Sequence, residues 1–326
     1  MTPPLALTMG DPGGIGPEIC VKALASGQLA ADVVVVGDRG ALLQAQQTLD
    51  LDLTVRHIDN SVERTPARGV IDVVQVGRLE HVPVGIVSAG AGEAAYAYIE
   101  RAVHGIQAGE FRGLVTAPIN KEALHLAGIP FPGHTEMLAS LAGVEHATMM
   151  LYNPELRVVL VSVHVALREA IESLSVESEL RAIRAAASIG PAFGLDSVRI
   201  AVAGLNPHAG EGGMFGDEEA RIIAPAIAEA RADGLDVSGP WPGDTVFMNA
   251  RAGAFDVVVA QYHDQGLIPV KYLGLDAGVN VTLGLPFVRT SVDHGTAFAI
   301  AGQGIASADS LIVAIDAAAR FSRTPT

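Results

Sequence analysis

The sequence has little cysteine and little positive charge, and it lacks any long apolar run. A single cysteine, Cys20, excludes an internal disulfide and indicates a reducing compartment. No stretch approaches the roughly 18 consecutive apolar residues of a membrane span, so we expect no transmembrane helix. The first residues have neither a basic flank nor a long apolar core, and they do not resemble a signal peptide. These absences predict a cytoplasmic protein with no membrane partner.

Positive charge is scarce because 21 Lys and Arg residues face 36 Asp and Glu residues, for a net charge of −15. Such a surface repels nucleic acid and anionic membranes, so we predict no nucleic-acid partner. An anionic substrate would need a few local cations to overcome this background. Apolar residues make up 49% of the chain and charged residues 17%, which is typical of a globular, core-rich protein. Its 326 residues are too many for one small core, and we expect two lobes.

Apolar, β-branched runs alternate with alanine-rich stretches along the chain. The runs are typical of buried strands, and they cover residues 5–8, 33–36, 114–116, 158–163, 200–203 and 257–260. The alanine-rich stretches predict helices, at residues 179–187, 217–234 and 309–321. This alternation indicates an α/β architecture.

Three histidines each lie just past the end of one of these runs: His164, His208 and His263. Ligands of open α/β sheets bind outside the carboxyl ends of the strands, so we expect the three imidazoles to converge there. Three protein ligands with an open position are typical of a catalytic metal site. For each histidine taken alone, a hydrogen-bonded loop residue is the alternative interpretation.

A glycine-rich segment, residues 9–18, follows the first predicted strand and opens a helix. Gly13, Gly14 and Gly16 resemble a dinucleotide-binding loop, and Asp38 follows the second strand at about the distance such a loop requires. The glycine spacing departs from GxGxxG, so a tight strand-to-helix turn that needs positive φ is the alternative.

Two helix starts suggest anion binding. Lys121 follows the predicted N-cap Asn120. A cation at the start of a helix opposes the helix dipole, so its presence there needs an explanation other than helix stability, such as anion binding. His134 and Thr135 lie at a loop-to-helix junction, which offers free backbone N–H groups to an anion. The alternatives are a solvated lysine and a threonine that only caps its helix.

Charged residues surround the last of the three histidines. Asp264 is expected either to bind the metal or to orient the imidazole of His263. Lys271 and Arg289 follow, and cations near a metal site suggest recognition of a phosphate or a carboxylate. Each of them alone is more often a surface charge.

Eight segments in order resemble the 4-hydroxythreonine-4-phosphate dehydrogenase family of pyridoxal phosphate biosynthesis: GDPGGIGPEI, TAPINKEAL, PGHTE, SVHVALR, LNPHAGEGG, GDTVF, YHDQGLIPVK and GLPFVRTSVDHGTA. The resemblance implies a two-lobed α/β fold like that of isocitrate and isopropylmalate dehydrogenases, with the active site in the cleft between the lobes. The first lobe, with the dinucleotide-binding elements, is expected at residues 1–132 and 275–326. The second, with the metal ligands and dimer contacts, is expected at residues 133–274. Residues 293–302 are similar to the dinucleotide loop of that superfamily, so Asp38 is no longer expected to contact a dinucleotide.

The resemblance also implies roles for individual residues. It assigns a divalent metal, expected to be zinc, cobalt, magnesium or manganese, to His164, His208 and His263. It implies substrate contacts at His134, Thr135, Lys271, Asn280 and Arg289, and catalytic roles for Asp244 and Lys271. It implies contacts to NAD, or alternatively NADP, at Asp293, His294, Gly295, Thr296 and Ala297. Family members are homodimers whose active site takes residues from both subunits.

The implied reaction oxidises 4-phosphooxy-L-threonine to a 3-oxo acid, which decarboxylates to 3-amino-2-oxopropyl phosphate. The proton acceptor is expected to be Asp244 or a metal-bound water. Related branches oxidise 4-phospho-D-threonate or 4-phospho-D-erythronate, and TAPINKEALHLAG, PGHTEML and MFGDEE resemble that branch at least as well. A metal-dependent phosphatase or hydrolase with the same histidines is the alternative from another class, and a non-catalytic binding protein is a third.

Overall fold

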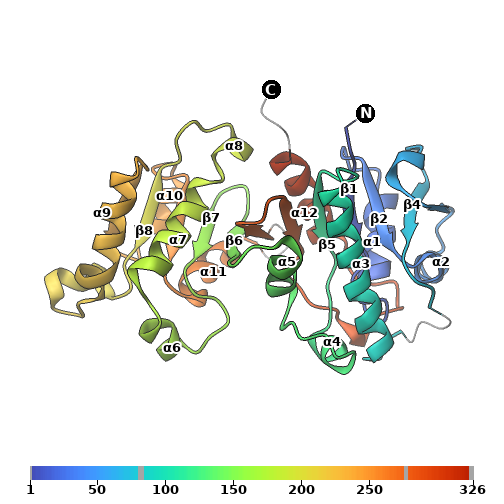
Figure 1. Ribbon diagram of the computed structural model, residues 1–326, viewed down its shortest axis with the longest axis horizontal. Helices are drawn as coiled ribbons and strands as arrows, with labels where there is room; N and C mark the ends of the chain where they lie inside the picture. The colour runs from blue at the N-terminus through green and yellow to red at the C-terminus, as the bar shows by residue number, and fades with distance from the viewer. Residues whose placement is uncertain (1, 80–83, 275–277, 323–326) are drawn as a thin grey trace. The chain divides into compact units, whose positions relative to one another are not determined.

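The computed structural model describes residues 2–79, 84–274 and 278–322 (Figure 1). The chain divides into two compact units, the first built from Met1–Ala147 and Leu285–Ser322, the second from Thr148–Gly284. The sequence places the corresponding boundaries after residues 132 and 274. Strands and helices alternate in both units, so the predicted α/β class is confirmed. Among the described helices, none has the length and apolar character needed to cross a bilayer.

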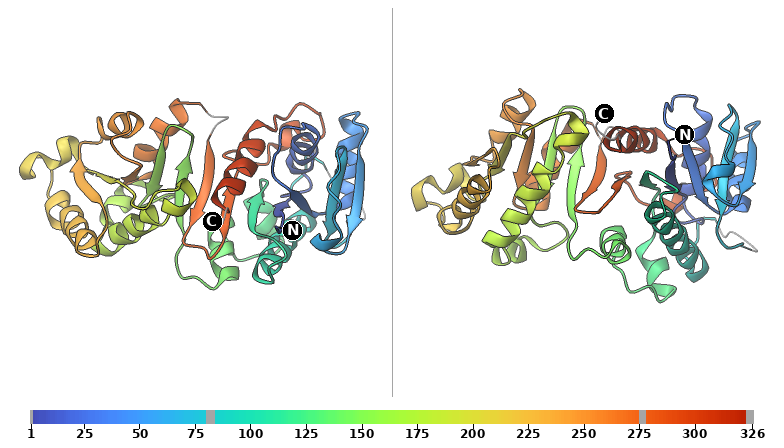
Figure 2. Two further views of the ribbon diagram at one scale, coloured as in Figure 1. Left: turned by 90° about the horizontal axis from the view of Figure 1, so that it is seen from above. Right: turned by 45° about the horizontal axis from the view of Figure 1, so that its top comes forward.

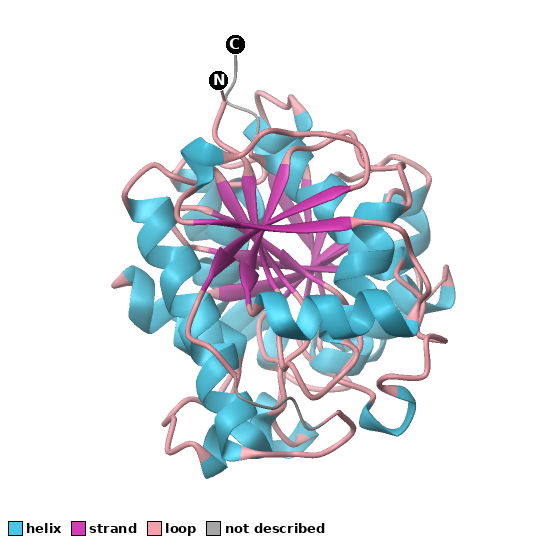
Figure 3. Ribbon diagram, turned by 90° about the vertical axis from the view of Figure 1, so that its right-hand side faces the viewer, coloured by secondary structure: helices cyan, strands magenta, loops and turns pink. Residues whose placement is uncertain are grey.

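The described part of the first unit contains a parallel sheet with the strand order β3-β4-β2-β1-β5-β12. Its strands are β1 (Leu5–Thr8), β2 (Val33–Gly37), β3 (Thr54–Ile58), β4 (Val70–Gln75), β5 (Gly113–Thr116) and β12 (Val288–Ser291). Helices lie on both sides of these strands (Figure 3). The apolar runs of β1 and β2 are continuous rather than alternating because both of their faces are buried.

Three helices of the first unit connect successive parallel strands, and the others follow β5 or β12. They are α1 (Gly16–Ala25), α2 (Arg39–Thr48), α3 (Ala89–Gln107), α4 (Lys121–Leu126), α5 (His134–Ala142) and α12 (Asp309–Phe321), with short 3₁₀ turns at Ser61–Glu63 and Phe298–Ile300. Although they come from opposite ends of the chain, α1 and α12 lie side by side (Figure 2). Asp38 is the N-cap of α2 and accepts a hydrogen bond from the N–H of Ala41 at 3.0 Å. Its carboxylate therefore has a structural role.

The second unit has the strand order β11-β6-β7-β10-β8-β9 within its described residues. Strand β6 is antiparallel to both of its neighbours here, and the other pairs are parallel. The strands are β6 (Thr148–Tyr152), β7 (Arg157–Leu160), β8 (Ile200–Ala203), β9 (Val237–Trp241), β10 (Val257–Ala260) and β11 (Val279–Leu283). The predicted strand 158–163 ends at Leu160.

The helices of the second unit are α6 (Leu167–Glu172), α7 (Val176–Ala187), α8 (Gly190–Phe193), α9 (Ala224–Ala232), α10 (Val246–Arg251) and α11 (His263–Tyr272). The helix predicted over residues 217–234 is divided, because a π-helical turn at Glu219–Ile223 precedes α9. Strands β7, β10 and β8 are parallel neighbours, so the loops that follow them leave the same edge of the sheet. These loops carry the three histidines singled out by the sequence.

Candidate active site

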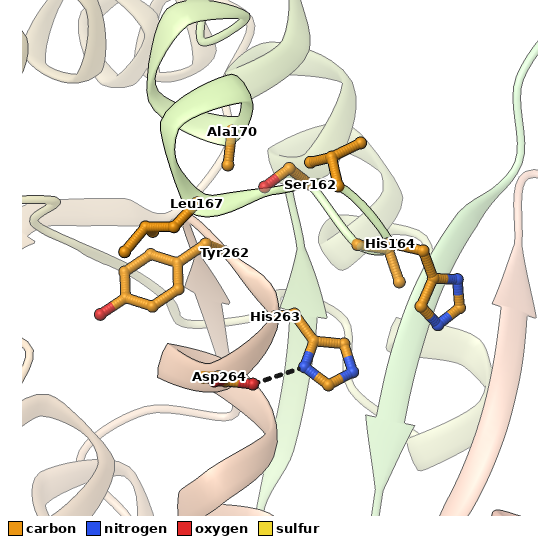
Figure 4. Close-up of a pocket in the computed structure, with 9 residues that line it drawn as sticks. Ser162, His164, Leu167, Ala170, Tyr262, His263 and Asp264 are labelled. Carbon is orange, nitrogen blue, oxygen red and sulfur yellow. Dashed lines mark hydrogen bonds and ion pairs between the residues drawn. The ribbon is translucent and has the colours of Figure 1, made fainter.

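His164 and His263 line one pocket of about 300 Å³ in the second unit (Figure 4). His164 lies in the loop after β7, and His263 is the first residue of α11, which begins three residues after the end of β10. Their ring centroids are 5.8 Å apart. The structure therefore brings two of the three predicted metal ligands together at the carboxyl ends of adjacent parallel strands, as the sequence predicts.

The imidazole of His263 is oriented by its neighbour. Its Nδ1 lies 2.7 Å from Oδ1 of Asp264, the contact drawn as a dashed line in Figure 4. When Nδ1–H donates to the carboxylate, Nε2 keeps a lone pair that is available to a metal. Of the two roles expected for Asp264, this contact favours orientation of the histidine, an arrangement common around metal-bound imidazoles.

His208 lies in an unusual loop, Pro207–Gly213, which follows β8. His208, Ala209 and Glu211 have φ angles of 52°, 53° and 43°, in the left-handed region. This conformation costs a non-glycine residue roughly 1–2 kcal/mol. Such strain persists only where the surroundings enforce it, and it is concentrated at functional sites.

Buried Glu219 anchors this strained loop. Its Oε1 accepts a hydrogen bond from the backbone N–H of Asn206 at 2.7 Å, and its Oε2 accepts one from Asn206 Nδ2 at 3.0 Å. Gly210 packs against the same carboxylate so closely that a Cβ there would lie 2.8 Å from Oε2. The sequence analysis missed Glu219, because its partners are in the loop that it holds and not in its own helix.

The three histidines do not form a three-ligand site within one chain. Among the described residues, no three histidine, cysteine or acidic side chains are close enough together to hold a metal. The residues that line the pocket of His164 and His263 do not include His208. The paired imidazoles suit a divalent transition metal, so the donors fit such an ion in part. The three-histidine site stays a prediction.

In the first unit, Arg289 of β12 is a buried cation, with only 4% of its surface exposed. It donates a hydrogen bond from Nη2 to Oγ1 of Thr116, at the end of β5, at 2.7 Å. Burial lowers the pKa of Arg289 to about 9, so the guanidinium is still charged at neutral pH. A buried guanidinium at the carboxyl end of a parallel strand is suited to binding an anion.

His134 lies near Arg289 and opens helix α5. Burial, and then the positive charge of Arg289, lower the pKa of His134 well below its usual value, so its imidazole is neutral. Its Nε2 is buried and has no hydrogen-bond partner among the described residues. The N-cap of α5 is Gly133, which has no side-chain cap, so the alternative in which Thr135 only caps the helix is wrong. The predicted N-cap at Asn120 is confirmed by its 2.8 Å contact with the N–H of Ala123.

Two motifs expected to bind the dinucleotide meet in the first unit. The N–H of Ile15 donates to the carbonyl oxygen of Thr296 at 3.0 Å. A Cβ at Gly14 would lie 2.8 Å from the same oxygen, so this position needs glycine for close approach. The alternative, in which positive φ explains these glycines, is wrong for Gly13, Gly14 and Gly16, since none of them has positive φ.

The loop from Asp293 to Ala297 follows β12, and a second pocket lies nearby. Thr296 is buried, whereas His294 and Gly295 are exposed, and Ala297 has a φ of 42°. The pocket, of about 170 Å³, is lined by residues of the glycine loop, of α1 and α2, of the segment that follows the loop, and by Val84: Pro12, Gly14, Pro17, Glu18, Ala41, Gln44, Ala45, Thr48, Val84, Ala301 and Gly302. Residues of the glycine loop and of the predicted dinucleotide-binding segment, 293–302, thus line the same pocket.

Asp11, which the sequence analysis did not select, stabilises the glycine loop. Its buried Oδ1 accepts a hydrogen bond from the N–H of Gly13 at 2.8 Å. Burial raises the pKa of Asp11 to about 6, although the backbone N–H groups of Gly13 and Gly14 oppose this. The GDP motif could have suggested it, because an aspartate two residues before a loop N–H is typical of an Asx-turn.

Three further predicted residues do not line the pocket of the histidine pair within one chain. Lys271 is in the last turn of α11 and His263 in its first, which separates them by about 12 Å along the axis at 1.5 Å per residue. Asp244 is exposed in the turn before α10, and Asn280 lies in β11 opposite Leu151. None of these three lines the pocket of His164 and His263.

Glu179 of α7 is completely buried, and burial raises its pKa from 4.5 to about 8, while Gln261 lowers it in part. Between these two pH values the folded state holds a proton that the unfolded state releases. The free energy of unfolding is therefore expected to fall as the pH rises from 4.5 to about 8. Glu179→Gln should remove this slope and be more stable than the wild type at the alkaline end, by a few kcal/mol at roughly 1.4 kcal/mol per pKa unit.

Urea unfolding at several pH values across this window measures the effect. Glu172→Gln, an exposed position in the same unit, is the matched control and should keep the wild-type slope. A difference between Glu179→Gln and the wild type that stays constant with pH would show that Glu179 is ionised in the folded protein.

Known proteins resemble this chain over nearly its whole length. The family model for the pyridoxal phosphate biosynthetic protein PdxA matches residues 29–318. A 4-hydroxythreonine-4-phosphate dehydrogenase from Beijerinckia indica is 56% identical over 324 residues, covering 99% of this chain and 96% of the relative. A D-threonate 4-phosphate dehydrogenase from Salmonella typhimurium is 48% identical over 325 residues, covering 98% of this chain and 99% of the relative.

A solved structure of a protein with one of these names has the same fold as this chain. The crystal structure of a 4-hydroxythreonine-4-phosphate dehydrogenase from Klebsiella pneumoniae superposes with a TM-score of 0.92 at 44% identity, covering 98% of this chain and 100% of the other. These relatives are named as dehydrogenases, which favours oxidation over the hydrolase alternative. The resemblance seen in the sequence motifs is confirmed: the chain belongs to the PdxA family and is an oxidoreductase.

Proposed function

We propose that the chain oxidises 4-phosphooxy-L-threonine with NAD and a divalent metal. The hydroxyl carbon loses a hydride to NAD and its oxygen loses a proton, which gives a 3-oxo acid. That acid loses carbon dioxide and takes up a proton to give 3-amino-2-oxopropyl phosphate. The observation that carries the proposal is the 56% identity, over 99% of the chain, to a protein named for this substrate.

Arg289 and the start of α5 are proposed to hold the phosphate. The buried guanidinium supplies a charge that solvent does not screen, in a protein whose net charge is −15. The first N–H groups of α5 are not capped by a side chain. The unpartnered Nε2 of His134 can hydrogen-bond to a substrate oxygen, with Thr135 beside it. Lys271 and Asn280 are proposed as further substrate contacts.

His164, His208 and His263 are proposed to hold the metal, with His208 supplied by a second copy of the chain. A divalent metal there would act as a Lewis acid on the substrate hydroxyl. Asp264 orients His263 for this role, and the loop held by Glu219 presents His208 at the surface. Asp244 is proposed to accept the hydroxyl proton. Zinc, cobalt, magnesium and manganese are the candidate metals.

The surface around His208 supports a homodimer. Phe215 packs beside the ring of His208, with 6.2 Å between centroids, and it is 46% exposed. Met214, the residue before Phe215, is 73% exposed. Exposed large apolar side chains gathered on one part of a protein are typical of an interaction surface.

The loop from Asp293 to Ala297 is proposed to contact NAD, with NADP as the alternative. It packs on the glycine loop at Gly14 and lies next to the pocket of about 170 Å³. Asp293, His294, Gly295, Thr296 and Ala297 remain the proposed contacts.

D-threonate 4-phosphate is the second candidate substrate. The relative from Salmonella typhimurium that carries this name is 48% identical over 98% of the chain. Such a substrate has a hydroxyl where 4-phosphooxy-L-threonine has an amine. We favour the amine because the relative named for it is more similar, at 56%.

Formation of NADH by the purified, metal-loaded protein tests the proposed function. We expect NADH with 4-phosphooxy-L-threonine, and a lower kcat/KM with 4-phospho-D-threonate and 4-phospho-D-erythronate. A higher kcat/KM with either of these two sugar acids would instead assign the protein to the branch that oxidises 4-phospho-D-threonate or 4-phospho-D-erythronate. Release of inorganic phosphate without NADH would instead support the hydrolase.

A further inference from the structure

Two glutamines connect the segments that carry the three predicted metal ligands. Gln261 lies two residues before His263 and directly after β10. Its Nε2 donates to the carbonyl oxygen of Ala203, the last residue of β8, at 2.9 Å. Gln265 of α11 donates from Nε2 to the carbonyl oxygen of Gly204 at 2.7 Å. Both bonds join the His263 segment to the chain that continues into the His208 loop.

The same glutamines are joined to each other and to the third segment. The Oε1 of Gln265 accepts a hydrogen bond from the backbone N–H of Gln261 at 2.7 Å. The carbonyl oxygen of Gln261 accepts one from Oγ of Ser162 at 2.8 Å, and Ser162 lies two residues before His164. The hydrogen bonds of the two glutamines therefore reach all three histidine-bearing segments of one chain.

Gln265 uses both halves of its amide. Among neutral side chains, only an amide offers an acceptor oxygen and a two-proton donor at the same distance from the backbone. The position of its amide is also restricted, because Gly243 packs against it: a Cβ at Gly243 would lie 3.0 Å from Nε2 of Gln265. A shorter amide or a side chain with one polar function would lose at least one of the two bonds.

These bonds lie beyond the point where β8 and β10 stop pairing with each other. The strand pairing of β8 and β10 ends at Val202 and Val259, whereas the histidines come several residues later. The His208 loop also has a strained, left-handed backbone. Side-chain bonds at this edge are thus what fixes the start of the loop relative to α11.

We propose that Gln265, together with Gln261, is a positioning residue that sets the placement of the metal-binding histidines. The inference rests on the proposed metal site. Residues that orient metal ligands from behind typically change metal affinity by about 10- to 100-fold when replaced. The expected result for Gln265→Leu is a loss of this size in affinity for Co²⁺, because Leu has a similar volume and neither hydrogen bond.

Gln46→Leu is a matched control from the other unit. Gln46 is also half-buried, and its Nε2 donates to the carbonyl oxygens of Leu51 and Leu53 at 3.0 and 2.8 Å. Its replacement removes two similar bonds, far along the chain from the histidines. It should lower the unfolding temperature of the metal-free protein about as much as Gln265→Leu, and leave Co²⁺ affinity unchanged.

Titration of the metal-free dimer or monomer with Co²⁺, followed by visible absorption, gives affinity and ligand geometry without turnover. We expect a weaker binding constant and altered bands for Gln265→Leu. A second variant, Gln265→Glu, keeps the acceptor for Gln261 but loses the donor to Gly204, and should also bind more weakly. This separates the Gly204 bond from the Gln261 bond.

Wild-type affinity and bands in both variants would overturn the positioning role while the metal site itself stood. An equal loss of affinity in Gln46→Leu would overturn it too, because the effect would then be general destabilisation. If the wild-type protein binds no Co²⁺, the proposed metal site fails, and the positioning role fails with it.

Discussion

Replacement of His208 by alanine is expected to lower kcat/KM for NADH formation by at least about 10³-fold. A metal ion contributes several kcal/mol of transition-state stabilisation, and each 1.4 kcal/mol is about tenfold in rate. The left-handed backbone of His208 and the buried carboxylate of Glu219 hold this side chain at a defined place on the surface. The same variant should bind Co²⁺ weakly and NAD as well as the wild type, because the proposed NAD contacts lie in the first unit.

His146→Ala is a suitable control for this experiment. His146 is in the first unit, with half of its side-chain surface exposed, and its Nε2 lies 3.6 Å from Oε1 of Glu145. Its removal should leave both turnover and Co²⁺ binding unchanged. Full activity of His208→Ala in metal-depleted buffer would exclude a metal role for this histidine.

Variants of His208 also test whether this histidine comes from a second copy of the chain. If His208 of one chain completes the site of another, mixing inactive His208→Ala with inactive His263→Ala should restore part of the activity. Mixed dimers can contain one site with an intact set of three histidines, whereas each pure variant contains none. An absence of any recovery after subunit exchange would support a site built within one chain.

Replacement of Arg289 by methionine is expected to lower kcat/KM for the phosphorylated substrate by about 10²- to 10³-fold, mainly through a higher KM. Removing one partner of a buried, hydrogen-bonded charge pair typically costs 2–5 kcal/mol. Arg289 is 4% exposed and bonded to Thr116, so its geometry is defined before any anion arrives. Methionine keeps most of the volume of the side chain and removes the charge.

Arg289→Lys should recover only part of this loss, because a lysine keeps the charge but cannot present a planar two-pronged donor. Arg56→Met serves as the control: Arg56 is in the same unit, pairs with Asp72 at 2.6 Å and is 36% exposed. Inhibition by inorganic phosphate should weaken in Arg289→Met and not in Arg56→Met. Unchanged phosphate inhibition in Arg289→Met would place the phosphate elsewhere.

The strands were largely predictable because buried parallel strands leave a local signal. Residues 5–8, 200–203 and 257–260 are strands with the predicted bounds. The strand predicted over residues 158–163 ends at Leu160, and beyond it the hydroxyl of Ser162 donates to the carbonyl oxygen of Gln261. That contact joins residues 99 positions apart, which no local pattern can reveal.

Some residues of the candidate site could be predicted from the sequence, and others could not. His164 and His263 could be paired from the sequence because each follows a parallel strand, and the edge where such strands end is shared. The catalytic and substrate roles assigned to Asp244, Lys271 and Asn280 depend on the family resemblance and stay predictions. Glu219, Gln261 and Gln265 could not be selected, since acids and amides are usually solvated unless the fold buries them.

The order of apolar runs and the residues that follow them determined the α/β class, the family and the histidines to examine. These are properties of neighbouring residues and of motif order, so they are readable before folding. Only the tertiary structure decided which polar groups are buried and which distant carbonyl each side chain meets. Gln265 illustrates the reason, because its bond to Gly204 spans 61 positions and exists only once β8 and β10 lie side by side.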